Sequence, residues 1–198
     1  EMQLKIENAE IGKLEEYLAR KTSELEDYST ITDSPDINSV MEAKLSYYRK
    51  IQGENDLTGK GVIIEIRDSD KLVKPGENPN DFLVHDQDLL RIINDLKISG
   101  AEAISINGQR YMSFSEIKCS GPTVTINGKT YGQPFVIKGI GDPANLEAAI
   151  KSIDSYSYML NSIYGIKIDV RTSESVVITR YWRSKQYNYL KKIVEDTE

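Results

Sequence analysis

The side chains best suited to chemistry lie close together in the middle of the chain. His85, the only histidine, is followed by Asp86 and Asp88 in "HDQDLL", and Arg110 follows the "NG" pair at 107–108. A histidine beside a carboxylate can act as a general base, and an arginine can bind a carboxylate or phosphate. Such a base needs a nucleophile or a bound substrate nearby. We therefore predict no catalytic residue, and at most ligand or partner contact through His85, Asp88 and Arg110.

Each of these residues also has a structural interpretation. Asp86 and Asp88 precede the apolar periodic run "LLRIINDL", where acidic residues cap a helix or complement its N-terminal charge. Asn107-Gly108 supplies the positive φ values of a type I′ hairpin turn. Arg110 is then placed to pair with Glu102 or Glu116 across the sheet, or to present its guanidinium to a partner.

Three further patterns could indicate a bound cofactor or metal, and none is complete. "GIGDPA" at 139–144 lacks the third glycine or the lysine of a phosphate-binding loop. Asp68 and Asp70 alternate as in calcium loops but lack the required glycine and glutamate. The single cysteine, Cys119, cannot form an internal disulfide, and we expect a buried thiol acting as a small apolar side chain. We predict no cofactor and no metal.

The order of elements predicts the fold. We expect a strand in "GVIIEI", a helix over 85–100 with Leu89, Leu90, Ile93 and Leu96 inside, hairpins at 107–108 and 127–128, a strand in "QPFVIKGIGD", one helix over 144–164, and two strands around "TSES". Two helices on one face of an antiparallel sheet form an α+β sandwich. Its skeleton is the ferredoxin-like βαββαβ arrangement with an extra β-hairpin, preceded by an N-terminal helix or coiled coil.

The front of the chain has heptad character. Apolar residues recur at intervals of seven, with Leu14 and Tyr28 at d positions of the same register. The candidate dimer seam is Leu4, Ile11, Leu14, Leu18 and Leu25. A single amphipathic helix lying on its own domain is the alternative. Pro35 breaks the pattern, and a second helix is expected over about 37–52. Residues 1–54 hold 7 Lys and Arg against 12 Asp and Glu, whereas the rest is nearly neutral, so we predict a lead-in at 1–54 and an α+β domain at 55–198.

Charge bears on the kind of partner. A net charge of −6 argues against a nucleic-acid surface, which needs a basic face. The tail "RYWRSKQYNYLKKI" is basic and aromatic, and we expect it to lie across the sheet, with a membrane-proximal role as the second choice. No apolar run reaches the roughly 18–20 residues that cross a bilayer. Because the chain begins "EMQLKIEN" without an initiator methionine, we expect it to be a fragment of a longer protein.

Five stretches resemble a known family. "LTGKGVIIEI", "LVHDQDLLRIINDLKISGAEAISINGQR", "IKCSGPTVTINGK", "PFVIKGIGDPANLEAAI" and "GIKIDV" are similar, in this order, to the YlxW/YlxX-like group of uncharacterised bacterial proteins. The resemblance covers about Leu57 to Val170. The resemblance implies a protein with an N-terminal membrane anchor, a coiled coil and an α+β domain outside the cytoplasmic membrane. Members of this group are often encoded beside cell-division genes in Gram-positive bacteria. The family supplies no catalytic residues to carry over.

Together these observations predict a non-enzymatic scaffold or adaptor of the cell envelope, linked to cell division or wall assembly. We expect it to form a dimer through the N-terminal helix, to contact other envelope proteins and to bind no nucleic acid. The competing hypothesis is a small-ligand sensor or enzyme, with a pocket beside the first helix and hairpin of the α+β domain.

Overall fold

The computed structural model describes residues 11–12, 15–23, 37–182 and 188–189. The chain divides into two compact units, Glu1–Tyr48 and Arg49–Glu198, and helix α2 (Ile37–Ile51) spans the division. Of the predicted seam, Ile11 and Leu18 lie in helical segments, and their side chains are 51% and 62% exposed. The seam residues Leu4, Leu14 and Leu25 lie outside the described part of the chain.

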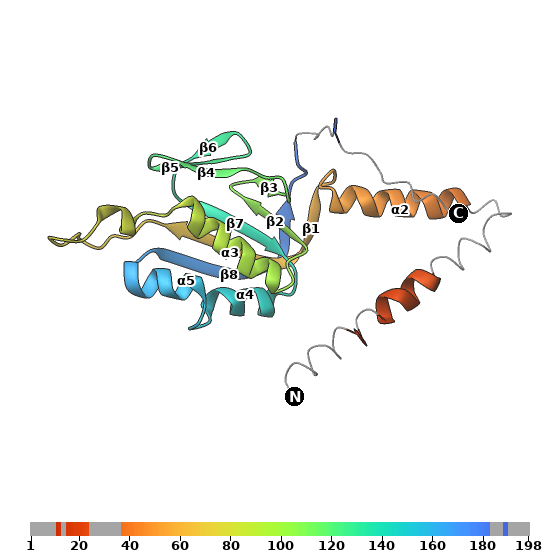
Figure 1. The fold of residues 1–198 in the computed structure, drawn as a ribbon, viewed down its shortest axis with the longest axis horizontal. Helices are drawn as coiled ribbons and strands as arrows, with labels where there is room; N and C mark the ends of the chain where they lie inside the picture. Colours follow the sequence, from red (N-terminus) through yellow and green to blue (C-terminus); the bar gives the residue numbers. More distant parts are fainter. Residues whose placement is uncertain (1–10, 13–14, 24–36, 183–187, 190–198) are drawn as a thin grey trace. The chain divides into compact units, whose positions relative to one another are not determined.

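A five-stranded antiparallel sheet organises the second unit. Its strand order is β3-β2-β7-β1-β8, which puts β1 near the centre and leaves β3 and β8 at the edges (Figure 1). The strands are β1 (Leu57–Arg67), β2 (Ala103–Ile106), β3 (Gln109–Tyr111), β7 (Phe135–Ile140) and β8 (Lys167–Ile178). The prediction of a mixed α+β fold is confirmed.

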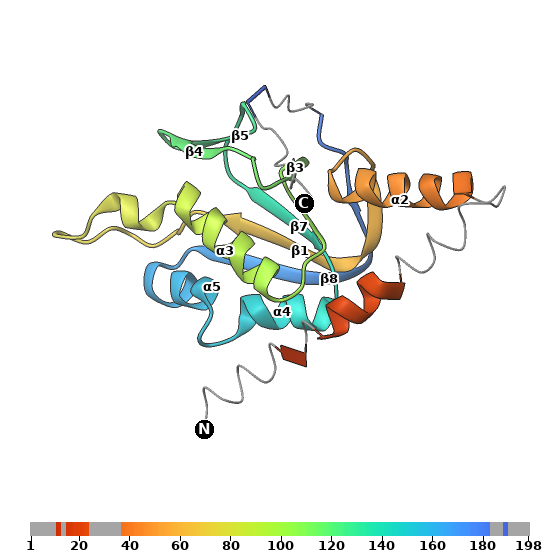
Figure 2. The same ribbon diagram turned by 45° about the vertical axis from the view of Figure 1, so that its right-hand side comes forward.

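The helices of this unit lie on one face of the sheet (Figures 1 and 2). Helix α3 connects β1 to β2, and the segment from α4 to η2 connects β7 to β8. The bounds are α3 (Asp86–Ile98), α4 (Pro143–Lys151), α5 (Tyr156–Met159) and the π-helical turn η2 (Leu160–Tyr164), with a 3₁₀ turn η1 (Pro79–Phe82) before α3. Because side chains alternate along a strand, Val62, Ile64 and Ile66 of β1 all point into the core under these helices.

The inner face of α3 differs from the prediction at two positions. Leu89, Ile93 and Leu96 are buried as expected, but Leu90 is 39% exposed, and Ile92, which was not predicted, is fully buried. With 3.6 residues per turn, positions 89, 92, 93 and 96 share one stripe, and position 90 falls outside it. The prediction for Leu90 was therefore wrong.

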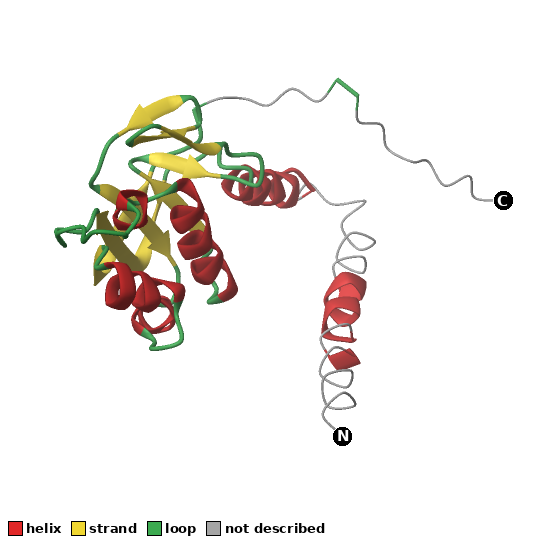
Figure 3. Cartoon of the chain, turned by 60° about the vertical axis from the view of Figure 1, so that its left-hand side comes forward, coloured by secondary structure: helices red, strands yellow, loops and turns green. Residues whose placement is uncertain are grey.

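Both predicted Asn-Gly turns are present. Asn107 and Asn127 have φ values of 45° and 50°, and each joins two paired strands. The second turn belongs to a separate three-stranded sheet (Figure 3). Val124 and Ile126 of this sheet pack into the core. Its strands are β4 (Ile117–Ser120), β5 (Thr123–Ile126) and β6 (Lys129–Tyr131). The insertion is therefore larger than the single extra hairpin that the sequence predicted.

Two predicted boundaries are wrong. The expected helix over 144–164 breaks after Lys151, because Ser155 starts a new helix by accepting a hydrogen bond from the Tyr158 N–H at 3.0 Å. The two strands expected around "TSES" are one continuous strand, β8. The "TSES" residues remain alongside β1. The pairing register between β1 and β8 shifts between Gly59 and Gly61, and this shift is a β-bulge.

This bulge lies where β1 and β7 come very close together. A Cβ atom on Gly61 would lie 1.9 Å from the carbonyl oxygen of Gly139 in β7. Beyond the bulge, Val176 and Ile178 of β8 pack with Ala103 and Ile140 in a second, smaller apolar cluster. These residues belong to the face of the sheet that the helices do not cover, so the far end of β8 closes part of that face.

The segment after β8 continues past the β2–β3 hairpin. Thr179 Oγ1 donates to the Gly108 carbonyl at 3.1 Å, and the Trp182 indole N–H donates to Gln109 Oε1 at 3.0 Å. The start of the basic, aromatic tail therefore lies against the sheet edge at β3. The rest of the tail, apart from residues 188–189, lies outside the described residues.

The close approach at Gly61 predicts a large effect of a single methyl group. Gly61→Ala should lower the free energy of unfolding by about 3 kcal/mol or more, because neither backbone can move without disturbing the sheet. Urea denaturation followed by circular dichroism measures this. Gly132→Ala is the matched control, since nothing lies within 4 Å of its added Cβ, and it should change stability by less than about 0.5 kcal/mol. Equal stabilities for the two variants would contradict the packing described here.

Candidate functional site

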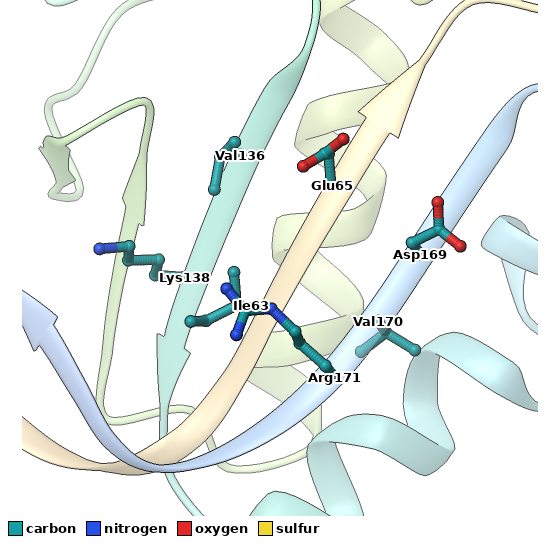
Figure 4. A pocket seen from close by; sticks show the side chains of 7 residues that line it. All are labelled: Ile63, Glu65, Val136, Lys138, Asp169, Val170 and Arg171. Carbon is teal, nitrogen blue, oxygen red and sulfur yellow. The ribbon is translucent and has the colours of Figure 1, made fainter.

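The face of the five-stranded sheet turned away from α3, α4 and α5, called the open face from here on, carries a hollow of about 400 Å³. Figure 4 shows it with α3 behind the sheet. Three strands, β1, β7 and β8, supply the lining, which consists of Ile63, Glu65, Val136, Lys138, Asp169, Val170 and Arg171. The bent end of β8 with Val176 and Ile178 covers another part of the same face.

Strand register brings like charges into rows across the open face. Ile63 of β1 pairs with Lys138 of β7 on one side and with Arg171 of β8 on the other. Two residues further along β1, Glu65 pairs with Asp169 of β8. The row of Lys138, Ile63 and Arg171, with two cations, thus lies beside the row of Val136, Glu65 and Asp169, with two carboxylates. Such a surface suits a partner that carries both charges.

Some of these charges are already paired within the chain. Arg67 Nη2 lies 2.5 Å from Glu65 Oε1, and Lys138 Nζ reaches the Val177 carbonyl at 3.5 Å. Within the described residues, Asp169 and Arg171 have no ion-pair or hydrogen-bond partner. Both side chains are exposed on β8, at the edge of the sheet. These two are the charges most readily available to another molecule.

Arg110 shares the open face, because it pairs in register with Ser105, which in turn pairs with Lys138. It is only 3% exposed, and its Nε and Nη1 atoms have no hydrogen-bond partner within the described residues. Burial lowers the pKa of its guanidinium, since the charged form loses hydration. No ion pair to Glu102 or Glu116 is present among the described residues. Arg110 is therefore a buried cation in need of an acceptor.

His85 and Asp88 lie on the other side of the sheet, at the start of α3. The His85 backbone N–H donates to Asp88 Oδ2 at 2.7 Å, and Tyr156 of α5 donates its hydroxyl to Asp88 Oδ1 at 2.6 Å. The His85 ring Nε2 lies 2.8 Å from the Asn80 carbonyl oxygen. Both oxygens of the Asp88 carboxylate are thus used to begin α3 and to hold α5 against it.

Asp86 and Cys119 join α3 to the small sheet. The Cys119 N–H donates to Asp86 Oδ2 at 2.8 Å, and the Asp86 N–H donates to the Cys119 sulfur at 3.2 Å. Partial burial alone would raise the pKa of Asp86, but hydrogen bonds from Cys119 and Gln87 outweigh it and lower that pKa. Partial burial of the sulfur, with the neighbouring carboxylates, raises the pKa of the Cys119 thiol.

Cys119 therefore differs from the prediction. As a residue it is exposed, although its sulfur is partly covered. Its thiol lies 4.0 Å from His85 Nδ1. The raised pKa keeps the thiol protonated at neutral pH, which opposes a nucleophilic role. The expectation of a buried apolar thiol was wrong because the strand that carries it, β4, lies at an edge of the small sheet.

The structure thus brings His85 and Asp88 together and leaves Arg110 on the opposite face. The hollow residues Glu65, Lys138, Asp169 and Arg171 were not predicted. Apolar and charged residues alternate in "VIIEIR" and "KIDVR", and this alternation indicates that the charged side chains share one face of each strand. The sequence does not show that these strands are neighbours, so it could not predict that their charged residues lie together. Within the described residues, no three His, Cys, Asp or Glu side chains are grouped to hold a metal ion. None of the described helices has the length and apolar character to cross a membrane.

Comparison with known proteins identifies the family. Residues 44–191 match the family described as "Bacterial protein of unknown function (DUF881)", and the chain belongs to this family. It is 42% identical to the UPF0749 protein YlxW of Bacillus subtilis over 96 residues, which is 48% of this chain and 41% of that protein. It is 30% identical to the UPF0749 protein YlxX of the same organism over 148 residues, or 72% of this chain and 57% of that protein. The resemblance to the YlxW/YlxX group is confirmed.

A solved structure shares the fold. A crystal structure of an uncharacterized conserved protein from Mycobacterium tuberculosis superposes with a TM-score of 0.60 at 25% identity, and the match covers 76% of this chain and 99% of that one. The chain spans about half the length of the curated relatives it matches. These likenesses define the family and the fold.

The bond between Tyr156 and Asp88 yields a prediction. Tyr156→Phe should lower the free energy of unfolding by about 1–2 kcal/mol, because Asp88 loses a donor to a buried carboxylate. Burial, followed by the Asp88 bond, raises the pKa of Tyr156 from 10.0 to about 12. The folded protein therefore favours the neutral phenol, and this contribution is present below pH 10 and lost as the pH rises toward 12.

Chemical denaturation at pH 7 and across pH 9–12 tests both parts. Tyr158→Phe is the control, since Tyr158 is 44% exposed, and it should leave the unfolding free energy and its alkaline slope unchanged. An alkaline slope that is the same in the wild type and in Tyr156→Phe would refute the assignment.

Proposed function

We propose that the chain belongs to a non-enzymatic scaffold or adaptor of the cell envelope that acts in cell division or wall assembly and dimerises through its N-terminal helix. The observation that carries the proposal is the exposure of Ile11 and Leu18, two heptad positions on helical segments with no apolar cover. Apolar side chains in this pattern are typical of a coiled-coil seam that a second helix buries. Membrane anchoring, and contacts with other envelope proteins, are part of the same proposal.

Helix α2 supports the proposal independently. Met41, Leu45 and Tyr48 are spaced by four and three residues and are 61%, 50% and 51% exposed. This is the spacing of one helical stripe. A surface helix whose apolar stripe meets solvent has a strong reason to associate with another helix. The charged residues between these positions keep the remaining faces hydrated.

The topology of residues 55–198 and the division of the chain are part of the same proposal. The segments β1-α3-β2 and β7-α4-α5-β8, with the strand order β2-β7-β1-β8, support a ferredoxin-like description of residues 55–198. The change in charge near residue 55, and the division of the chain at Tyr48, support a separate lead-in at 1–54.

The dimer is tested by breaking the seam. Ile11→Asp with Leu18→Asp should raise the dimer dissociation constant measured by sedimentation equilibrium, because charges at seam positions cannot be buried without a partner. Glu16→Ala, on an exposed position of the same helix outside the seam, should leave that constant unchanged. A monomer in the unmodified chain at high protein concentration would disprove pairing through this helix.

The envelope role is tested in the organism that encodes the chain. The full-length protein should sediment with membranes, and a fluorescent fusion should collect at the division septum. The seam variant should stay in the membrane fraction but lose its septal enrichment. An even cytoplasmic distribution of the full-length fusion would refute the envelope assignment.

A small-ligand sensor is the second candidate, and the buried Arg110 favours it. A cation that is 3% exposed, with two nitrogen atoms lacking acceptors in the described residues, is stabilised by a small anion that reaches it. At matched ionic strength, phosphate should then raise the melting temperature of the wild type more than that of Arg110→Met. An equal phosphate effect in both proteins would eliminate Arg110 as an anion contact.

A further inference from the structure

Strand β8 is an open edge of the main sheet. It is twelve residues long, and β1 is its one strand partner in the described part of the chain. Every second backbone N–H and C=O of β8 therefore faces outward, and such a row is a template for another strand. Long edge strands are usually protected by charges, and the charges here are arranged in a way that favours one specific partner.

We infer that β8 pairs antiparallel with β8 of a second copy of this chain, about a two-fold axis at Val170. In that register, Asp169 of each copy lies opposite Arg171 of the other. Residues 167–173 of both strands overlap, and the two five-stranded sheets become one sheet of ten strands. The inference goes beyond the proposed function and does not depend on the N-terminal helix.

Charge complementarity selects this register. Asp169 and Arg171 are exposed and have no partner within the described residues, and both point to the open face. Directly opposite residues in an antiparallel pair lie about 4.5–5.5 Å apart, close enough for an ion pair. Moving the axis by one residue, to Asp169 or to Arg171, puts two like charges opposite each other. The sequence "DVR" is therefore complementary to itself only when Val170 is at the centre.

The surroundings of the strand fit the same arrangement. In Figure 4, Asp169 lies on the outer strand of the hollow, while Arg171 extends from β8 toward Ile63. Arg171 there shares its row with the cation Lys138, and the partner's carboxylate would relieve that repulsion. Because Arg171 is exposed, its side chain changes rotamer freely and can turn toward the edge. On the opposite face, Ile168 and Val170 are only partly buried and gain cover from the second copy.

A cross-link tests the geometry. In the full chain with Cys119→Ser, Val170→Cys should form an intermolecular disulfide under mild oxidation, because the two Cα atoms would lie within disulfide range. Val177→Cys is the matched control, since it is exposed on the same strand but lies outside the overlap, and it should not cross-link. Equal cross-linking at the two positions, or none at 170, would overturn the inference.

Charge reversal tests the register. The dimer dissociation constant is measured by sedimentation in the Ile11→Asp, Leu18→Asp background, so that pairing through the N-terminal helix does not contribute. Asp169→Arg or Arg171→Asp alone should weaken dimerisation about tenfold, because each creates two like-charge contacts. The double variant should return to within about threefold of the starting value. Single variants without effect, a double variant no better than either single, or no dimer in this background would each contradict β8 pairing.

Discussion

The placement of every sheet-covering helix on one side of an antiparallel sheet is the constraint on which the rest of this structure depends. It divides β1 into two sets of side chains. Val62, Ile64 and Ile66 are buried under α3 and α4. Ile63 and Glu65 point to the opposite face. Because Gly61 lets β1 approach β7 closely and bend, the end of β8 closes part of this second face. The remainder stays open, and Ile63 and Val136 lie within its two charged rows.

The two faces use their polar groups differently. On the helix side, the two carboxylate oxygens of Asp88 accept hydrogen bonds from the His85 N–H and the Tyr156 hydroxyl. The Asp86 carboxylate accepts a hydrogen bond from the Cys119 N–H. These carboxylates fix the start of α3 and join three separate elements of the fold. On the open face, charges such as Asp169 lack such partners within the described residues. Groups that are fully engaged in shaping the backbone cannot also bind, so of the two faces of the sheet it is the open face, with its β8 edge, that carries charges still available to another molecule.

Sequence periodicity predicted the local elements well. The Asn-Gly turns and the existence of α3 follow from local rules, and the α+β class follows from the order of elements. The misprediction of Leu90 shows how sensitive a helical stripe is to its phase. Exposure of Cys119 was not predictable, because it depends on which edge of the small sheet β4 occupies. The grouping of Glu65, Lys138 and Arg171 likewise depends on the pairing of strands that are far apart in the chain.

Amide hydrogen exchange along β8 tests most directly whether the open face and its edge are the contact surface. The full chain is measured at several protein concentrations, and the outward-facing amides of residues 167–173 are compared with those of residues 174–178. The account predicts that protection in the first group rises with concentration while the second group is unchanged. Exchange in residues 167–173 that is fast and independent of concentration would contradict it.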